Sequence, residues 1–292
     1  YARALNINAG VYANELNTVL GQNDIQVKDQ AAPQVSTAVS NLSTAANTPN
    51  FALDVGQLGG MYAGKIFLVG TENGLGVRNA GSINAAAGQL TLNANGDLMN
   101  VGNIIANKDQ IAIQAHNVKN SGNISSASAQ VTLQSQNLDN SGLISSADEL
   151  HLKQSGQSKN SGKLNAARIA LEANQLINTG AIQQTGSQAL DLQAAEVSNK
   201  AGKIGIMAAS GSAGGTGTGN PAAPDAEPPV NQAQDGGSLE VADTSSLPVK
   251  TFEKGFIRTA QILNNDSGKI EANGGIDLKT QSGLNNTGGQ LQ

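Results

Sequence analysis

The sequence predicts an all-β fold, a parallel β-helix with coils of about 20 residues and two loop excursions. Three observations lead to this prediction: an Asn-x-Gly motif recurs every 18 to 21 residues, aliphatic residues stand at fixed offsets from it, and aromatic residues make up only 2% of the chain. A unit of this size without helical periodicity forms short strands. It buries its apolar face by stacking on its neighbours.

The composition suits a thin and regular core rather than a spherical one. Trp and Cys are absent, Gly reaches 35 of 292 residues, and charged residues make up 13%. A compact core of this size would normally use more aromatic side chains. The net charge of −5 makes nucleic acid a poor candidate partner. No stretch is long and apolar enough to span a bilayer.

The Asn-x-Gly motif marks one corner of each coil. Glycine is expected there because a Cβ atom would cost energy or block the next coil. Asparagine is expected because it tolerates an unusual backbone angle, and because its amide can bond the Asn one coil away. The predicted corners are Asn100 and Gly102, Asn120 and Gly122, Asn140 and Gly142, Asn160 and Gly162, and Asn178 and Gly180. Further copies stand at Asn79 and Gly81, and looser ones at Asn199 and Gly202, Asn265 and Gly268, and Asn286 and Gly288.

Aliphatic residues flank each corner and predict the core. One lies two residues before each Asn, with Ser158 as the one polar exception, and another lies two residues after each Gly from Gly81 to Gly268. Between successive corners lie triplets such as "LTL" at 90–92, in which two aliphatic residues flank a variable one. This alternation is expected for a strand with one buried face. The predicted core stack is Leu98, Val118, Leu138, Leu176 and Val197 before the corners, and Ile104, Ile124, Ile144, Leu164 and Ile182 after them.

Stacking also predicts a column of charges outside the helix. The residue before the corner Asn is Lys119, Asp139 and Lys159 in three consecutive coils. Adjacent coils should lie about 4.8 Å apart, which places the aspartate between two lysines. Exposed pairs of this kind contribute about 0–1 kcal/mol each.

Breaks in the repeat divide the chain into five parts. We expect β-helix coils over 1–23, an excursion over the Ala/Ser/Thr-rich residues 24–50, and β-helix over 51–208. Residues 209–237 are rich in Gly and Pro and are expected to form a flexible loop. The repeat resumes over 238–292, where we expect further coils.

The residues do not indicate a catalytic, metal or cofactor site. His116 and His151 fall on different parts of the repeat, and a metal or catalytic pair would have to converge with carboxylates. The acidic residues are scattered rather than gathered on one wall, so a glycosidase pair is not supported. We therefore expect no cofactor and no enzymatic activity, with a polysaccharide-cleaving β-helix enzyme as a remote alternative.

Two segments carry a family resemblance. "ALNINAGVYANELNTVLGQND" (4–24) and "LGGMYAGKIFLVGTENGLGVRNAG" (58–81) resemble the haemagglutination-activity region of secreted exoproteins. These are the filamentous haemagglutinins and the contact-dependent growth inhibition proteins of the CdiA type, and the 20-residue units resemble filamentous-haemagglutinin repeats. The resemblance implies that the β-helix is right-handed. It also implies two-partner secretion through a dedicated outer-membrane transporter, and a location at the bacterial cell surface.

The resemblance leaves two functions open. We favour a structural stalk in a large surface filament that presents a distal effector, namely a contact-dependent growth inhibition toxin. The alternative is a haemagglutinin-like adhesin that binds host cells or glycans. The receptor and the effector cannot be deduced from these residues.

Overall fold

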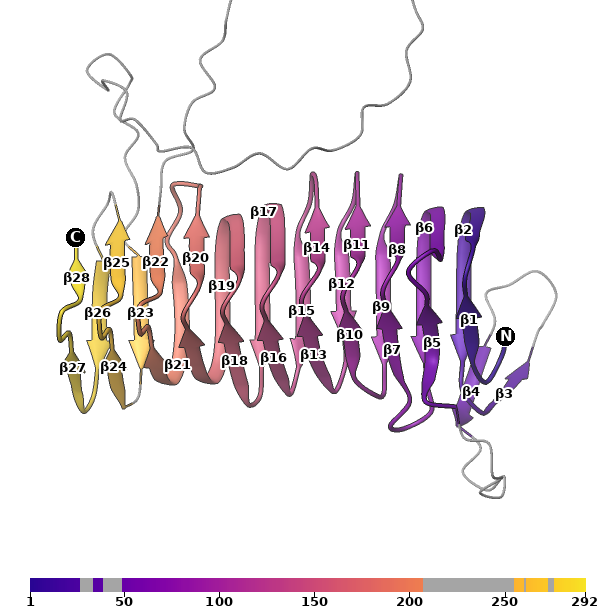
Figure 1. The fold of residues 1–292 in the computed structure, drawn as a ribbon, viewed down its shortest axis with the longest axis horizontal. Coiled ribbons are helices and arrows are strands. Elements are labelled where there is room, and N and C mark those ends of the chain that lie inside the picture. Colours follow the sequence, from indigo (N-terminus) through magenta and orange to yellow (C-terminus); the bar gives the residue numbers. More distant parts are fainter. Residues whose placement is uncertain (27–33, 39–48, 207–254, 260, 273–275) are drawn as a thin grey trace, which may run out of the picture.

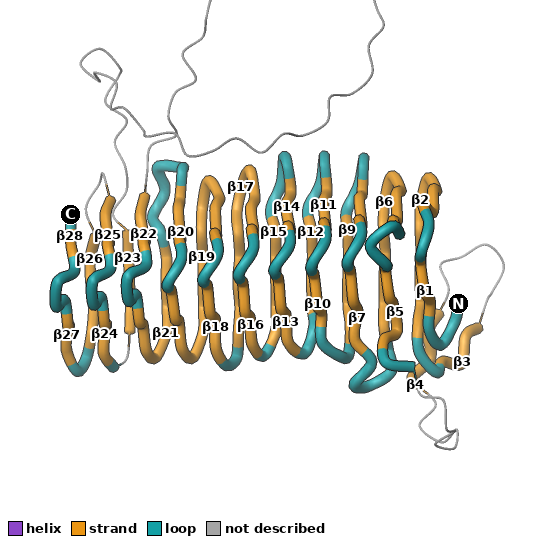
Figure 2. The backbone as a smooth tube through the Cα atoms, in the orientation of Figure 1, coloured by secondary structure: helices purple, strands orange, loops and turns teal. Residues whose placement is uncertain are grey.

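The computed structural model describes residues 1–26, 34–38, 49–206, 255–259, 261–272 and 276–292. Its strands stack as successive coils along one long axis, with the N-terminus at one end and the C-terminus at the other (Figure 1). The tube view shows the same order, strands joined by short corners (Figure 2). The described residues contain no helix, hence none that could cross a membrane. The predicted parallel β-helix is confirmed, because 26 of the strands join in parallel pairs.

Each coil passes along three walls, and equivalent strands of successive coils pair within one wall. The first wall holds β1 (Leu5–Ile7), β5 (Phe51–Val55), β7 (Gly76–Asn79), β10 (Leu98–Asn100), β13 (Asn117–Asn120), β16 (Asn137–Asn140), β18 (Gln157–Asn160), β24 (Ile262–Asn264) and β27 (Gly283–Asn285). The second wall holds β8 (Ser82–Ala85), β11 (Asn103–Ala106), β14 (Asn123–Ser126), β20 (Ala181–Gln184), β22 (Lys203–Ile206), β25 (Lys269–Ala272) and β28 (Gln290–Leu291).

The third wall completes the coil, and five longer strands turn from one wall to the next. The third wall holds β9 (Leu90–Ala94), β12 (Ile111–Gln114), β15 (Val131–Ser135), β23 (Gly255–Thr259) and β26 (Ile276–Thr280). The long strands are β2 (Gly10–Leu20), β6 (Gly60–Gly70), β17 (Leu143–Gln154), β19 (Lys163–Asn178) and β21 (Asp191–Ser198).

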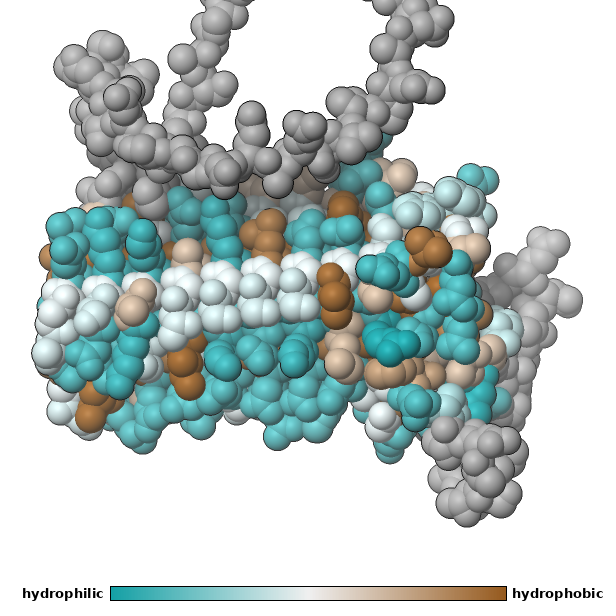
Figure 3. Space-filling view, viewed as in Figure 1, coloured by the Kyte–Doolittle hydropathy of each residue, from teal (hydrophilic) through white to brown (hydrophobic). Residues whose placement is uncertain are grey.

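The register places each residue over its equivalent in the next coil. Ile104 pairs with Ile124, and Ile124 with Ile144, so one aliphatic column runs along the axis. Rows of like hydropathy accordingly run lengthwise over the visible face, a pale row lying between hydrophilic ones (Figure 3). β22 also pairs directly with β25, although 62 residues lie between Ile206 and Lys269 in sequence, so the described strands on either side of residues 207–254 belong to neighbouring coils.

The inward columns form the core. The aliphatic residues predicted to stack there are all buried, with 0% or 1% of each residue exposed: Leu98, Val118, Leu138, Leu176, Val197, Ile104, Ile124, Ile144, Leu164 and Ile182. Burying one such side chain contributes about 1.5–3 kcal/mol. Each coil adds only a few of them, so the solenoid depends on the contact between neighbouring coils.

The corner glycines allow one coil to approach the next. A Cβ atom built on Gly142 would lie 2.1 Å from the carbonyl oxygen of Gly122, and one on Gly122 would lie 2.1 Å from that of Gly102. None of these three residues has a positive φ. Glycine is therefore required by the approach of the neighbouring backbone rather than by its own conformation.

Three later corners contain one more residue, and that residue is left-handed. Ala201 has a φ of 56°, Ser267 of 52° and Gly288 of 62°, and each directly precedes the glycine that faces the coil before. In the last corner this glycine is Gly289, whose added Cβ would lie 2.2 Å from the Asn265 carbonyl oxygen. The sequence had indicated Gly288, because the motif alone does not show the inserted residue.

The excursion predicted over 24–50 contains a β-hairpin in its described part. β3 (Asn23–Gln26) and β4 (Gln34–Ala38) pair with each other in an antiparallel sheet and with no other described strand. The hairpin lies beside the N-terminal end of the solenoid (Figure 1). We did not expect strands in this Ala/Ser/Thr-rich segment. The loop predicted over 209–237 lies outside the described residues, and the five boundaries remain predictions.

An ion pair fastens the start of the chain to the second coil. Nη2 and Nε of Arg3 donate to the Glu72 carboxylate, at 2.8 and 3.1 Å. These hydrogen bonds lower the pKa of Glu72, and burial of the carboxylate opposes the shift. The pair therefore favours the folded state when Glu72 is ionised.

Replacing Gly142 by Ala is expected to destabilise the solenoid by about 1–3 kcal/mol or more, because its Cβ meets a backbone carbonyl that cannot rotate away. Urea denaturation followed by circular dichroism measures the change. Gly70→Ala is the matched control, since its Cβ would meet nothing closer than 3.7 Å. An equal effect of the two substitutions would contradict the close-approach explanation.

The Arg3–Glu72 pair is expected to make stability depend on acidity. Because the folded pKa of Glu72 is lowered, the contribution is complete above the ordinary value near 4.5 and is lost as the pH falls through the folded pKa. Arg3→Ala should lower stability slightly at neutral pH and leave it unchanged at low pH. Urea midpoints across pH test this, with Lys153→Ala at the exposed Lys153–Glu172 pair as control. A constant difference between wild type and Arg3→Ala at all pH values would argue against it.

Candidate functional site

A ladder of buried asparagines runs through the corners. Nδ2 of Asn100 donates to Oδ1 of Asn120 at 2.7 Å, and Asn120 donates in turn to Asn140 at 2.8 Å. Every rung measures 2.6–2.8 Å, and each interior asparagine is 0% or 1% exposed. The full ladder is Asn79, Asn100, Asn120, Asn140, Asn160, Asn178, Asn199, Asn265 and Asn286.

Each amide of the ladder also holds two backbone segments. Nδ2 of Asn100 donates to the carbonyl oxygens of Gly102, at 3.1 Å, and of Asn123 in the next coil, at 3.2 Å. The same triple contact recurs at Asn120 and Asn140. The amide thus bonds its own corner, the next coil's corner and the next asparagine, so buried carbonyl groups at the turn gain partners.

The ladder has one direction and an incomplete end. Every rung donates toward the C-terminal side, so the amide dipoles point the same way and polarise one another. Asn79 begins the ladder, because Val55 occupies its position in the coil before. Oδ1 of Asn79 is buried and has no hydrogen-bond partner within the described residues.

The backbone at these asparagines is ordinary. We expected Asn partly because it tolerates an unusual angle, but the positive-φ residues of the described chain other than glycine are Ala201 and Ser267. Asn100, Asn120 and Asn140 each end an extended strand of the first wall. Their contribution comes from the side-chain amide.

The charges beside the corners align as the register requires. Lys119 pairs with Asp139, and Asp139 with Lys159, on the outer face of the first wall. Nζ of Lys159 lies 4.0 Å from Oδ1 of Asp139, and both side chains are about half exposed. Such a contact contributes little to stability.

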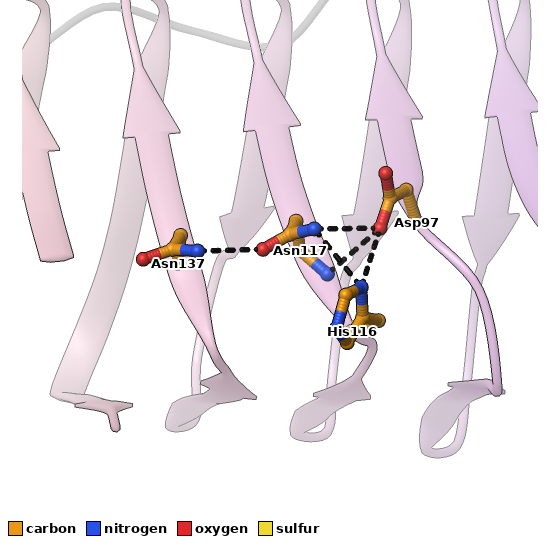
Figure 4. Close-up of polar contacts among 4 residues, drawn as sticks. All are labelled: Asp97, His116, Asn117 and Asn137. Carbon is orange, nitrogen blue, oxygen red and sulfur yellow. Dashed lines mark hydrogen bonds and ion pairs between the residues drawn. The ribbon is translucent and has the colours of Figure 1, made fainter. Parts of the chain in front are cut away.

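A second ladder of side chains runs outside, three residues before the corner asparagines from Asn100 to Asn199. Nδ2 of Asn137 donates to Oδ1 of Asn117 at 2.9 Å, and Nδ2 of Asn117 donates to Oδ1 of Asp97 at 2.9 Å (Figure 4). The backbone N–H of Asn117 also donates to this carboxylate oxygen, at 3.1 Å. The outer ladder therefore ends at Asp97, on a group that only accepts hydrogen bonds when ionised.

The other half of the outer ladder runs in the opposite direction. Nε2 of Gln157 donates to Gln175 at 2.7 Å, and Nε2 of Gln175 donates to the Glu196 carboxylate at 2.9 Å. Between Asn137 and Gln157 the direction reverses, and the backbone N–H of Gln157 donates to Oδ1 of Asn137 at 2.9 Å. Both ends of the ladder are thus carboxylates.

This outer ladder was missed in the sequence, although a signal for it exists. Counting three residues back from the six corner asparagines between Asn100 and Asn199 gives an unbroken series of amides and carboxylates: Asp97, Asn117, Asn137, Gln157, Gln175 and Glu196. We compared only the aliphatic positions and the charge column, so this polar column went unnoticed.

His116 lies at the N-terminal end of the outer ladder. Its Nδ1 atom is 3.2 Å from Oδ1 of Asp97 and 3.0 Å from Nδ2 of Asn117 (Figure 4). One nitrogen cannot donate to the first atom and accept from the second in the same tautomer. Both His116 and Asp97 are more than half exposed. His151 lies on the third wall, paired with Thr132 and Ala170.

Two shallow grooves border this cluster. One of about 430 Å³ is lined by Phe51, Asn73, Asn95, Asp97 and His116 among others. The second, of about 420 Å³, lies between the outer ladder and the charge column and also includes Asp97. Within the described residues no group of three His, Cys, Asp or Glu side chains could hold a metal ion.

Comparison with known proteins gives relatives for part of this solenoid. The chain is 46% identical over 112 residues to "Toxin CdiA" of Yersinia pestis, which is 38% of this chain and 3% of that protein. It is 50% identical over 100 residues to "tRNA nuclease CdiA-2" of Burkholderia pseudomallei, 34% of this chain and 3% of that protein. "16S rRNA endonuclease CdiA" of Enterobacter cloacae is 37% identical over 98 residues, again 34% of this chain and 3% of that protein. No family model and no solved structure matches.

Fold and ladders together define a parallel β-solenoid. The relatives then confirm the resemblance predicted from the sequence, since about a third of the chain is similar to proteins of the CdiA type. Their names favour the toxin branch over the haemagglutinin-like adhesin. The matches span about 3% of the length of these relatives.

The expectation that the protein is not an enzyme is wrong. Relatives of this chain are named as a tRNA nuclease and as a 16S rRNA endonuclease. We based the expectation on the lack of converging catalytic side chains in this sequence. The relatives are much longer proteins, and repeats that build a solenoid give no sequence signal for the activity in their names.

Asn140→Ala is expected to cost about 2–3 kcal/mol, because it leaves Oδ1 of Asn160 without its donor and removes an acceptor from Asn120. Urea denaturation of the purified chain measures the loss. Asn79→Ala is the matched control at the ladder's end, where Oδ1 already lacks a partner, and it should cost about 1 kcal/mol less. Equal losses at both positions would show that the bond from Asn120 to Oδ1 of Asn140, which has no counterpart at Asn79, contributes nothing.

Proposed function

We propose that this chain forms a rigid stalk segment in a CdiA-type toxin that is secreted to the bacterial cell surface. The stalk carries the toxic part of the same polypeptide away from the producing cell. The observation that supports this proposal is the asparagine ladder, which links the coils from Asn79 to Asn286. A continuous ladder together with aliphatic columns resists bending of one coil against the next.

The family suggests how the segment reaches the surface. We propose export through the outer-membrane transporter of a two-partner secretion system. A solenoid suits this route, because each coil can form on the previous one as the chain emerges. We further propose that the activity carried is a toxic one of the kind the relatives are named for, which includes RNA cleavage.

The test introduces charge into the core of three adjacent coils. Ile124, Ile144 and Leu164 are 0% exposed and stack in one column, so replacing all three by Asp costs several kcal/mol per site. In a producing strain that expresses the full-length protein, surface exposure of the chain should appear slowly, and inhibition of target cells should fall with it.

The matched control changes the outward residues of the same strands. Ser125, Ser145 and Asn165 also form one column, and Ser125→Asp, Ser145→Lys and Asn165→Asp should leave surface exposure unchanged. Surface labelling of whole cells and competition with target cells are measured together. Normal export and inhibition by the core variant would overturn the stalk proposal.

A further inference from the structure

One coil reverses the size pattern of the core. At the corner between the third and first walls, neighbouring coils place a small inward residue first and a larger aliphatic residue second. The coil that ends at Asn160 instead places Gln154 first and Ser158 second, and they are 2% and 0% exposed. The ordinary pairs are Ala94 and Leu98, Ala115 and Val118, Ser135 and Leu138, and Ala173 and Leu176.

The reversal conserves volume but not polarity. Gln154 pairs with Ser135 of the coil before, and Ser158 stands between Leu138 and Leu176 in the aliphatic column. A long side chain at 154 thus accompanies the short one at 158. Both, however, bring polar atoms into the core. Ser158 is polar in an aliphatic column, and Gln154 adds a second polar side chain beside Ser135 of the coil before.

Those polar atoms lack protein partners. Oε1 of Gln154, Oγ of Ser158 and Oγ of Ser135 are buried without a hydrogen bond among the described residues. Nε2 of Gln154 reaches the carbonyl oxygen of Leu133 only at 3.4 Å, beyond the usual range. Three of the six such atoms in the described chain therefore gather at one interface between coils. Buried polar groups without partners destabilise the folded state.

The outer side-chain ladder is interrupted at this interface. Because the ladder reverses its direction between Asn137 and Gln157, the link there runs from the backbone N–H of Gln157 to Oδ1 of Asn137, at 2.9 Å, instead of between two side chains. Asp139 and Lys159 meet only at 4.0 Å. The inner ladder continues, since Asn140 donates to Asn160 at 2.7 Å, and the strands keep their register.

We propose that the interface between β16 and β18 is the preferred internal opening point of the solenoid. It divides the rod into two blocks, one from the first coil to Asn140 and one from Gln157 onward, which the inner ladder and the backbone hold together. When the rod is pulled or bent, it separates first here. This inference does not depend on the toxin-stalk role, because it concerns the stability of one interface.

Hydrogen exchange of the purified 292-residue chain tests the opening point directly. The amides of Gly156 and Ser161 bond to the Gln136 and Asn140 carbonyls, and their equivalents one coil earlier, Gln136 and Ser141, bond in the same way. If the interface opens locally, exchange at 156–161 should be roughly tenfold or more faster than at 136–141. Equal protection of the two segments would overturn the proposal.

A double substitution tests the cause. Gln154→Ala with Ser158→Leu restores the pattern of the neighbouring coils, and should raise the melting temperature above wild type and slow exchange at 156–161 to the level of 136–141. Each single substitution should lower the melting temperature, because one leaves a cavity and the other overfills the core. A double variant no more stable than wild type, or single effects that simply add, would contradict the proposal.

The converse variant moves the defect to another coil. Ala115→Gln with Val118→Ser recreates the reversed pair between β12 and β13, whose own interface has the ordinary pattern. Fast exchange should then appear in the amides near 115–121. Unchanged protection there would show that the reversed pair does not create an opening point. The wild-type exchange comparison decides the matter on its own if this variant fails to fold.

Discussion

The spacing of about 4.8 Å between paired strands governs every other feature of this molecule. Because each coil lies one strand spacing from the next, every side chain stacks on its equivalent. A side chain of unsuitable size or polarity therefore affects the coils on both sides of it. Corner glycines follow from this spacing, since a Cβ on Gly142 would lie 2.1 Å from the Gly122 carbonyl oxygen. The same spacing lets an asparagine amide reach the next one, with rungs of 2.6–2.8 Å.

The two amide ladders differ in the direction in which their side chains donate hydrogen bonds. The inner ladder keeps one direction, which aligns its dipoles, and leaves an unpartnered oxygen on Asn79 at its start. The outer ladder ends in a carboxylate at both sides, Asp97 and Glu196, so its amides must donate outward from the middle. A ladder that donates in both directions must reverse somewhere, and it does so between Asn137 and Gln157. The inner ladder is buried and gains strength from cooperativity, whereas the outer one is in contact with solvent and tolerates the reversal.

Periodicity made most of the fold predictable from the sequence. The aliphatic offsets around each Asn identified the inward residues, and all ten that we named are 0% or 1% exposed in the structure. Features outside the repeat were harder to predict from the sequence. The hairpin of β3 and β4 pairs only with itself, so no column of equivalents marks it. The extra residue in the late corners shifted the close-approach position from Gly288 to Gly289, because a left-handed residue looks like any other in the sequence. The outer ladder had a sequence signal, but only the structure shows that the column forms hydrogen bonds rather than meeting solvent separately.

The effect of Gln154 and Ser158 on the core becomes visible only when the two positions are compared as a pair. Ser158 alone is one polar exception in an aliphatic column, and Gln154 alone is a polar residue at the end of a strand. Together they exchange a small–large pair for a large–small one, so total volume stays near that of the neighbouring coils. Oε1 of Gln154 and Oγ of Ser158 are then buried without a hydrogen-bond partner in the part of the chain that the structure describes. Packing in a solenoid is therefore a property of pairs across a corner, and stability a property of the interface between coils. A repeat protein can keep its register and its inner ladder through such a coil, since Asn140 and Asn160 remain bonded, and still place its weakest interface there.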